Sequence, residues 1–132
     1  SFVARPYNFD SAGGLVYEVD VTKDAGNRVI VRSFADGTPF DESQMYNVAM
    51  TSYRANGGGG IIRHGAGLDA AAVNGRIVSR HPEIRDLIYE YLKKNKVIDP
   101  EVTGDPSIVG AWKFTPVHLA ERAMEKDMSL LF

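Results

Sequence analysis

Four consecutive glycines at positions 57–60 constrain the fold of this chain more than any other feature of its sequence. They follow an apolar, strand-like run at residues 48–50 and a polar exit that contains Tyr53 and Arg54. Glycine adopts positive φ freely and has no side chain, so the backbone there can turn sharply and approach a flat ligand. An aromatic ring beside such a loop can stack on a planar base, which contributes about 1–3 kcal/mol. The stretch therefore favours either a ligand-binding loop or a glycine-rich hairpin in which Tyr53 packs on the core.

Length and composition fit one domain or part of one. The chain has 132 residues, is 44% hydrophobic and carries a formal charge of −2. This apolar content supports a packed core, and the interspersed charges argue against binding to a nucleic-acid polymer. No apolar run approaches the roughly 18 residues that a membrane span needs, so no membrane partner is expected.

The cysteine count bears on disulfides and thiol chemistry, and the first residue bears on processing. The chain has no cysteine, which excludes disulfides and thiol chemistry. It begins at Ser1 without Met, so we expect an excised or processed segment, and the missing signal peptide is therefore uninformative about export.

The first half of the chain has the alternation of apolar and polar residues that is typical of strands. Residues 15–21 and 28–34 predict a hairpin closed by turn residues at 23–27. Asp36 and Gly37 predict the next turn, and residues 46–52 predict a third strand that leads into the glycines.

The second half predicts one clear helix, at residues 82–94, where apolar residues recur on one face. We expect residues 61–72 to be mostly loop, with at most one helical turn, and residues 77–79 to form a short strand. A strand at 108–114 contains Trp112, and residues 120–128 predict a weak terminal helix. Together these elements predict an α+β fold with a mainly antiparallel, twisted sheet and a long amphipathic helix.

Catalytic motifs are missing from the sequence. The histidines His64, His81 and His118 stand far apart, and no spacing matches a metal site, a nucleophile elbow or a P-loop. The glycines could present amide groups to an anion, but no helix start or lysine is expected directly after them. Asp69, Glu83 and Asp86 are interpreted as solvated charges. We therefore predict no catalytic residue and no metal ligand in this chain.

Several motifs, in order, resemble the second half of the 5′-nucleotidase C-terminal domain. They are YNFD at 7–10, GLVYEVDV at 14–21, DGTPFD at 36–41, YNVAMTSYRANGG at 46–58, and Trp112-Lys113 after TGD at 103–105. The likeness covers most of residues 5–116 and is greatest to the 2′,3′-cyclic-nucleotide 2′-phosphodiesterase/3′-nucleotidase branch, which also has a Tyr-Arg pair before its glycines.

The resemblance implies part of an exported, periplasmic hydrolase of two domains. An N-terminal metallophosphatase domain would hold two divalent metals, such as Zn or Mn, and the C-terminal domain would bind the nucleotide or nucleoside. Residues 1–116 would then be a partial C-terminal domain whose upstream half is missing, with a terminal helix or tail at 117–132. Without the dimetal domain, the chain alone is expected to hold no cofactor and to be inactive.

The resemblance also implies a substrate-binding site in which two aromatic rings sandwich the base. The second ring corresponds to Tyr53, and the first corresponds to Tyr7 or Phe9, with Asn8 as a base or backbone partner. The implied set is completed by Asn56, Gly57, Gly58 and Arg54.

The chain departs from the family pattern at Gly59, where classical 5′-nucleotidases have an aspartate that holds the ribose hydroxyls. The phosphate-binding arginines of the family also lie upstream, which leaves Arg5, Arg54 and Arg63 as supplementary anion contacts. Two alternatives stay open: a stand-alone nucleoside-binding module, and a structural docking module in which Tyr53 lies at an interface.

Overall fold

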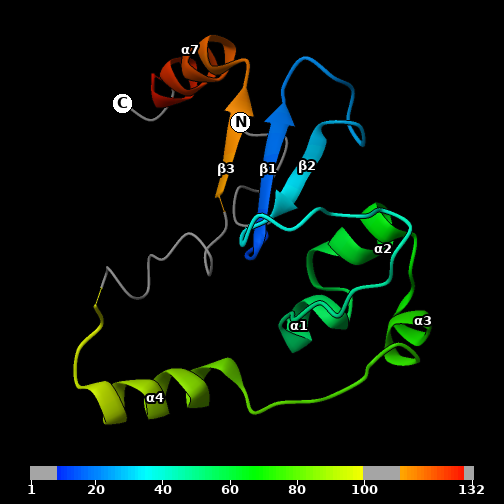
Figure 1. Cartoon of the computed structure of the whole chain (residues 1–132), viewed down its shortest axis with the longest axis vertical. Helices are drawn as coiled ribbons and strands as arrows, with labels where there is room; N and C mark the ends of the chain where they lie inside the picture. Colours follow the sequence, from blue (N-terminus) through cyan, green and yellow to red (C-terminus); the bar gives the residue numbers. More distant parts are fainter. Residues whose placement is uncertain (1–8, 100–110, 130–132) are drawn as a thin grey trace. The chain divides into compact units, whose positions relative to one another are not determined.

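The computed structural model describes residues 9–99 and 111–129, and it has an α+β fold with a small sheet and several helices (Figure 1). The chain divides into two compact units, which are described separately. A sheet unit contains the described residues 11–44 and 111–129, and a helical unit contains residues 9–10 and 45–99. The predictions for Arg5, Tyr7, Asn8 and residues 108–110 lie outside the described residues.

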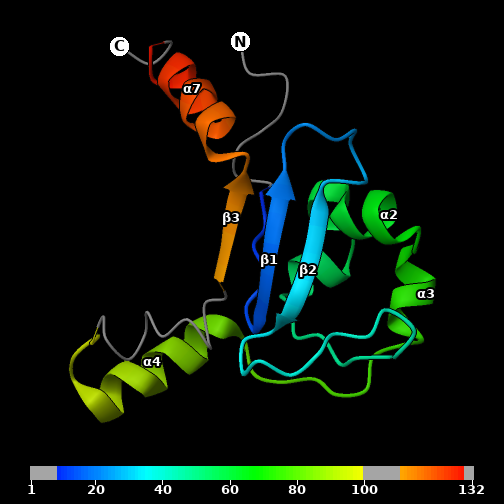
Figure 2. The same cartoon turned by 45° about the horizontal axis from the view of Figure 1, so that its top comes forward.

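The sheet has three strands in the order β2-β1-β3 (Figure 2). Strands β1, Leu15–Asp20, and β2, Val29–Phe34, pair antiparallel, which confirms the predicted hairpin. Strand β3, Ala111–Thr115, pairs with β1 in parallel. The expected mainly antiparallel sheet is therefore wrong, since the sheet is mixed. Because the helical unit intervenes between β2 and β3, the last strand enters by a long connection, which permits a parallel pairing.

Tyr17 on the central strand lies at the core of the sheet unit and is 7% exposed. Its ring stacks on Trp112, the neighbouring residue on β3, with centroids 5.9 Å apart and an interplanar angle of 11°. The Tyr17 hydroxyl accepts a hydrogen bond from the Ala12 N–H at 3.1 Å. The Trp112 ring also meets Phe114 edge to face at 5.1 Å. These contacts join β1 to β3 through aromatic side chains.

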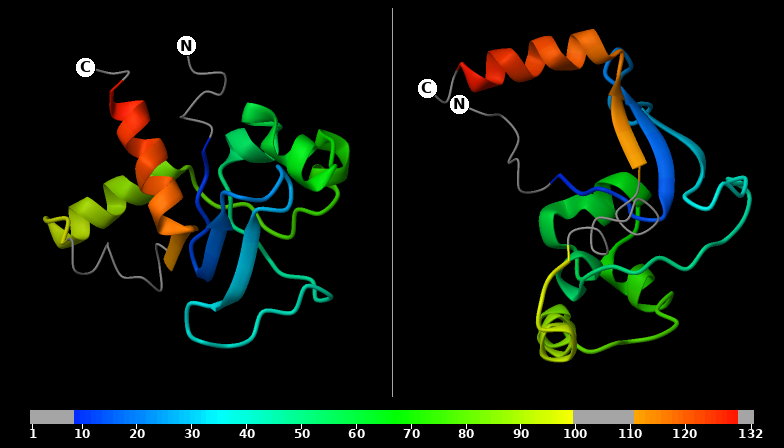
Figure 3. Two further views of the ribbon diagram at one scale, coloured as in Figure 1. Left: turned by 90° about the horizontal axis from the view of Figure 1, so that it is seen from above. Right: turned by 60° about the vertical axis from the view of Figure 1, so that its left-hand side comes forward.

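Helix α7, Val117–Met128, continues directly from the end of β3 and contacts that strand (Figure 3). It confirms the predicted terminal helix and begins three residues earlier than residue 120. Ala120 is 7% exposed and is the buried residue of this helix. A small side chain at that position lets the helix approach the strand closely.

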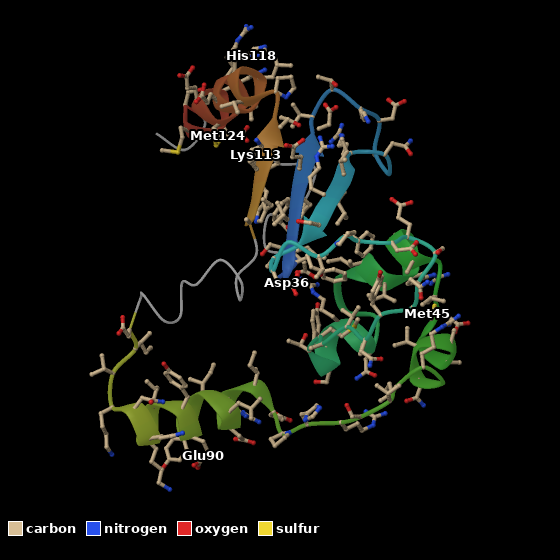
Figure 4. The ribbon with its side chains drawn as sticks, viewed as in Figure 1. Asp36, Met45, Glu90, Lys113, His118 and Met124 are labelled. Carbon is tan, nitrogen blue, oxygen red and sulfur yellow. The ribbon has the colours of Figure 1, made fainter. Side chains whose placement is uncertain are left out.

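Charged side chains complete the sheet unit at its surface. Glu18 on β1 pairs with Arg32 on β2 at 2.7 Å and with Lys113 on β3 at 3.4 Å, so one carboxylate bridges all three strands. The hydrogen bond from Arg32 holds the pKa of Glu18 below its ordinary value. In the predicted turn after β2, Asp36 accepts hydrogen bonds from the backbone and side chain of Thr38, which lower the pKa of Asp36 (Figure 4).

The helical unit contains α1, Ser52–Ala55, a 3-10 turn at Gly58–Gly60, α2, Ile61–Ala66, α3, Ala70–Asn74, and α4, Ile84–Asn95. The strands predicted at 46–52 and 77–79 do not form. Residues 46–51 have no regular secondary structure, and Ser52 begins α1, which Thr51 caps, since its hydroxyl accepts from the Arg54 N–H at 3.4 Å.

Residues 61–72 are more helical than the sequence predicts. Helix α2 begins directly after the glycines, so the expectation that no helix follows them is wrong. In α3, the Asp69 carboxylate accepts from the Ala72 N–H at 2.8 Å and caps a run of alanines, which are the best helix formers. The cap and the alanines outweigh the preference of the neighbouring glycines for a loop.

Helix α4 forms close to the predicted residues 82–94, with Glu83 as its N-cap and Lys96 ending it in the left-handed region at φ 64°. The apolar stripe of this helix is not packed within the described residues of its unit, since Ile84, Leu87 and Ile88 are each at least half exposed. A helix is thus present, but the packing that the amphipathic pattern predicts is not observed. None of the helices described has the length and apolar character needed to cross a membrane.

Candidate functional site

An ion pair joins the two stretches that the sequence singled out. The Arg54 Nη2 atom lies 2.7 Å from Asp10 Oδ1, across 44 residues of sequence. Asp10 directly follows Phe9, and Arg54 directly follows Tyr53. Both partners belong to the helical unit. The ion pair therefore holds the segment of one predicted aromatic against the helix that carries the other.

Arg54 makes further contacts with the glycine turn and with its neighbouring ring. Its Nη1 donates to the Gly58 carbonyl at 3.1 Å, and its guanidinium carbon lies 5.4 Å from the centroid of the Tyr53 ring. The Arg54 side chain is only 15% exposed. A planar guanidinium suits this position because it donates in two directions at once and attracts an aromatic face.

The Tyr53 ring packs on Gly58. A Cβ atom built at Gly58 would fall inside the contact distance of three carbon atoms of this ring, so only glycine leaves room for it. Tyr53 is nevertheless 62% exposed, which leaves much of its surface open to a ligand. Helix α1 is itself held by contacts with the 3-10 turn, α2 and α3, so the ring stands on a packed base.

Three of the four glycines are required by the backbone. Gly57, Gly59 and Gly60 have φ of 94°, 72° and 70°, in the left-handed region that favours glycine. Gly59 stands where the resembled family has an aspartate, a residue that tolerates the left-handed region better than most side chains do. The glycine run is therefore a tight turn that bends the chain from α1 into α2.

Three further residues considered from the sequence fall within the described ranges. Phe9 is 58% exposed. Asn56 is exposed and ends α1, where its N–H donates to the Ser52 carbonyl at 2.9 Å. Arg63 is an exposed residue of α2. The structure thus brings Phe9, through Asp10, to the helix of Tyr53, and it adds nothing on Tyr7 and Asn8.

Two contributions to this site do not follow from the sequence alone: the ion pair that Asp10 makes, and the space that Gly58 leaves for the Tyr53 ring. The available signal was the arrangement of the two motifs, since each has a charged residue of opposite sign directly after an aromatic residue.

The described residues do not fit a two-metal centre. No group of three histidine, aspartate or glutamate side chains comes together in the described ranges. Two of the three carboxylates considered from the sequence are engaged elsewhere: Asp69 caps α3, and Glu83 pairs with Arg85 at 3.0 Å. His118 lies on α7 in the sheet unit (Figure 4).

Replacing Gly58 by Ala tests the packing of the Tyr53 ring. The added Cβ should push the ring away from its preferred position and lower the free energy of unfolding by about 0.5–1.5 kcal/mol. Urea denaturation would measure this loss, and the ring resonances of Tyr53 should shift in NMR spectra.

Gly65→Ala is the matched control, because Gly65 lies in α2 with open space where its Cβ would be. This substitution should be neutral or stabilising by up to about 1 kcal/mol, as expected for Gly→Ala within a helix. Unchanged Tyr53 resonances in Gly58→Ala would contradict the packing described above.

Comparison with known proteins gives two matches to nucleotide-processing enzymes. A family model described as the 5′-nucleotidase C-terminal domain matches residues 2–67, which include both aromatic stretches and the glycine turn. The trifunctional nucleotide phosphoesterase protein YfkN of Bacillus subtilis (strain 168) is 31% identical over 136 aligned residues. The alignment covers 94% of this chain but 8% of YfkN, so the chain spans a small part of that relative. No solved structure matches the chain.

Proposed function

Because this chain belongs to the 5′-nucleotidase C-terminal domain family, we propose that it recognises the nucleoside part of the substrate of a nucleotide phosphohydrolase. The similarity to a nucleotide phosphoesterase supports the same class of substrate. In this proposal the parent enzyme is an exported hydrolase, either a 5′-nucleotidase or a 2′,3′-cyclic-nucleotide 2′-phosphodiesterase/3′-nucleotidase.

The proposal rests on the ion pair that joins the two aromatic stretches. Tyr53 and Phe9 are 62% and 58% exposed, and the residues that follow them form the Asp10–Arg54 ion pair. Exposed rings that stand on a packed support can sandwich a planar nucleobase without first being ordered. Binding then costs less conformational entropy. We propose Tyr53 as one face of the sandwich and Phe9 or Tyr7 as the other, with Asn8, Asn56, Gly57 and Gly58 around the ligand.

This role supplies position and not bond cleavage. Binding energy at the base, remote from the phosphoester, can orient that ester for attack and so raise the rate of a reaction that other residues carry out. The described residues offer no ligand set for two metals. We therefore place hydrolysis on a separate metallophosphatase domain of the parent protein, with Zn, Mn or similar ions, and propose that this chain alone is inactive.

Titration of the labelled chain with adenosine, followed by NMR, tests the proposal. The amides of Tyr53 and residues 57–60 should shift together, with a dissociation constant near millimolar, or about −4 kcal/mol. Ribose 5-phosphate is the control, since it has the sugar and the phosphate charge of a nucleotide but no base. It should leave the chemical shifts of these amides unchanged. A well-folded sample that does not respond to adenosine would contradict nucleoside recognition by this chain.

A further inference from the structure

We propose that Asp10 and Arg54 are positioning residues of the nucleoside site, whose ion pair sets the placement of the two aromatic segments. This inference rests on the proposed function and assigns a role to a pair of residues that need not touch the ligand. It also gives Arg54 a task other than the supplementary anion contact that the sequence favours.

The guanidinium of Arg54 is held by Asp10 and by the Gly58 carbonyl. One nitrogen of its guanidinium lies 2.7 Å from Asp10, and the other donates to the Gly58 carbonyl at 3.1 Å. The Arg54 side chain is 15% exposed, so most of it is withdrawn from water. A guanidinium held in this way has its positive charge balanced by Asp10 and is poorly placed to bind a phosphate.

The Asp10–Arg54 pair connects the Phe9 segment with the glycine turn and the Tyr53 ring. Arg54 reaches Asp10 beside Phe9, the carbonyl of Gly58, and the ring of Tyr53 at 5.4 Å. Gly58 is also the residue against which the Tyr53 ring packs. One side chain therefore contacts the residue beside Phe9, the glycine turn and the Tyr53 ring, across a sequence separation of 44 residues.

A second ion pair among the described residues of the same unit gives a comparison. Arg85 and Glu83 lie 3.0 Å apart, but their side chains are 80% and 66% exposed and they lie two residues apart at the start of α4. Exposed pairs of this kind contribute little, because water screens them and both side chains lose freedom. The Asp10–Arg54 pair differs in the burial of its arginine, which is 15% exposed while Asp10 is 45% exposed, and in the length of chain that it closes.

The test measures adenosine affinity in the full chain by NMR titration. Asp10→Asn keeps the volume of the side chain and removes its charge, and Arg54→Gln removes the guanidinium. Each variant should bind adenosine about 5- to 30-fold more weakly than the wild type, as loss of a charge-assisted hydrogen bond predicts. The double variant should lose no more than either single one, because the two residues act as a unit.

Three further variants or ligands separate positioning from a general structural role. Asp10→Glu restores a carboxylate and should recover part of the affinity. Glu83→Gln breaks the exposed pair on α4 and should change the affinity by less than about twofold. Adenosine 5′-monophosphate should lose affinity for Asp10→Asn by the same factor as adenosine, because the role of the pair does not depend on the phosphate.

Each other outcome overturns the inference in a recognisable way. If Asp10→Asn binds adenosine as the wild type does, the pair does not position the site. If Asp10→Asn instead binds the monophosphate more tightly, Arg54 is an anion contact that Asp10 restrains. If the wild-type chain itself does not bind adenosine, the proposed function fails and the positioning role falls with it.

Discussion

The Tyr53→Ala variant is expected to bind adenosine more weakly by about 1–3 kcal/mol, the usual contribution of one aromatic stacked on a base. The reason lies in the exposure of the ring, which is 62%, and in its support by Gly58. NMR titration or calorimetry on this chain would measure the loss. In the parent hydrolase, the same free energy should appear as a raised KM for nucleotides.

Two controls make the Tyr53 result specific. Tyr53→Phe keeps the stacking ring and should keep the affinity. Tyr89→Ala removes a ring of matched exposure, 63%, from α4 in the same unit, and should leave adenosine binding unchanged. If Tyr53→Ala instead keeps its affinity for nucleotides but fails to assemble with the rest of the parent enzyme, the ring is an interface residue.

The elements that the sequence predicted correctly are local ones. The hairpin of β1 and β2 follows from alternation on both sides of a short turn, and the turn at Asp36 follows from side-chain hydrogen bonds that span two residues. Helices α4 and α7 also form near their predicted positions, because a helix depends on neighbours three and four residues apart. Such elements are specified by residues within a short window of sequence.

The parts that the sequence did not predict depend on distant residues or on the balance of weak preferences. The parallel pairing of β3 with β1 joins residues far apart in the sequence, such as Val16 and Ala111, and no local pattern specifies its direction. The strand expected at 46–52 does not form, and its last residue, Ser52, begins α1 after the cap at Thr51. The exposed stripe of α4 shows that an amphipathic pattern predicts a helix more reliably than it predicts what covers the helix.

The candidate site divides in the same way. Tyr53 and the glycines could be identified because they are adjacent in sequence and chemically distinctive. The ion pair of Asp10 with Arg54 could not, because charges of opposite sign after the two aromatics do not by themselves show that residues 44 positions apart come together. The packing of Tyr53 on Gly58 also needed coordinates, since glycine in sequence indicates freedom of backbone before it indicates a missing side chain.

The second large effect is expected from Tyr17→Ala, which should lower the free energy of unfolding of the sheet unit by about 3–5 kcal/mol. Tyr17 is 7% exposed on the central strand and stacks on Trp112. Small domains are stable by only about 5–15 kcal/mol, so this loss would remove much of the margin. Trp112 is the single tryptophan of the chain, and its fluorescence during urea denaturation would report the unfolding of this unit.

Tyr17→Phe separates the contribution of the ring from that of the hydroxyl. It keeps the stack on Trp112 and loses the hydrogen bond from the Ala12 N–H, a net cost of about 0.5–1.5 kcal/mol. The cost should fall at the low end, because Ala12 is exposed and its N–H can bond to water instead. Equal losses in the two variants would assign the stability to the hydroxyl and contradict a core built on the stacked rings. A large loss in Tyr17→Ala alone would show that the parallel β1–β3 pairing depends on this aromatic contact.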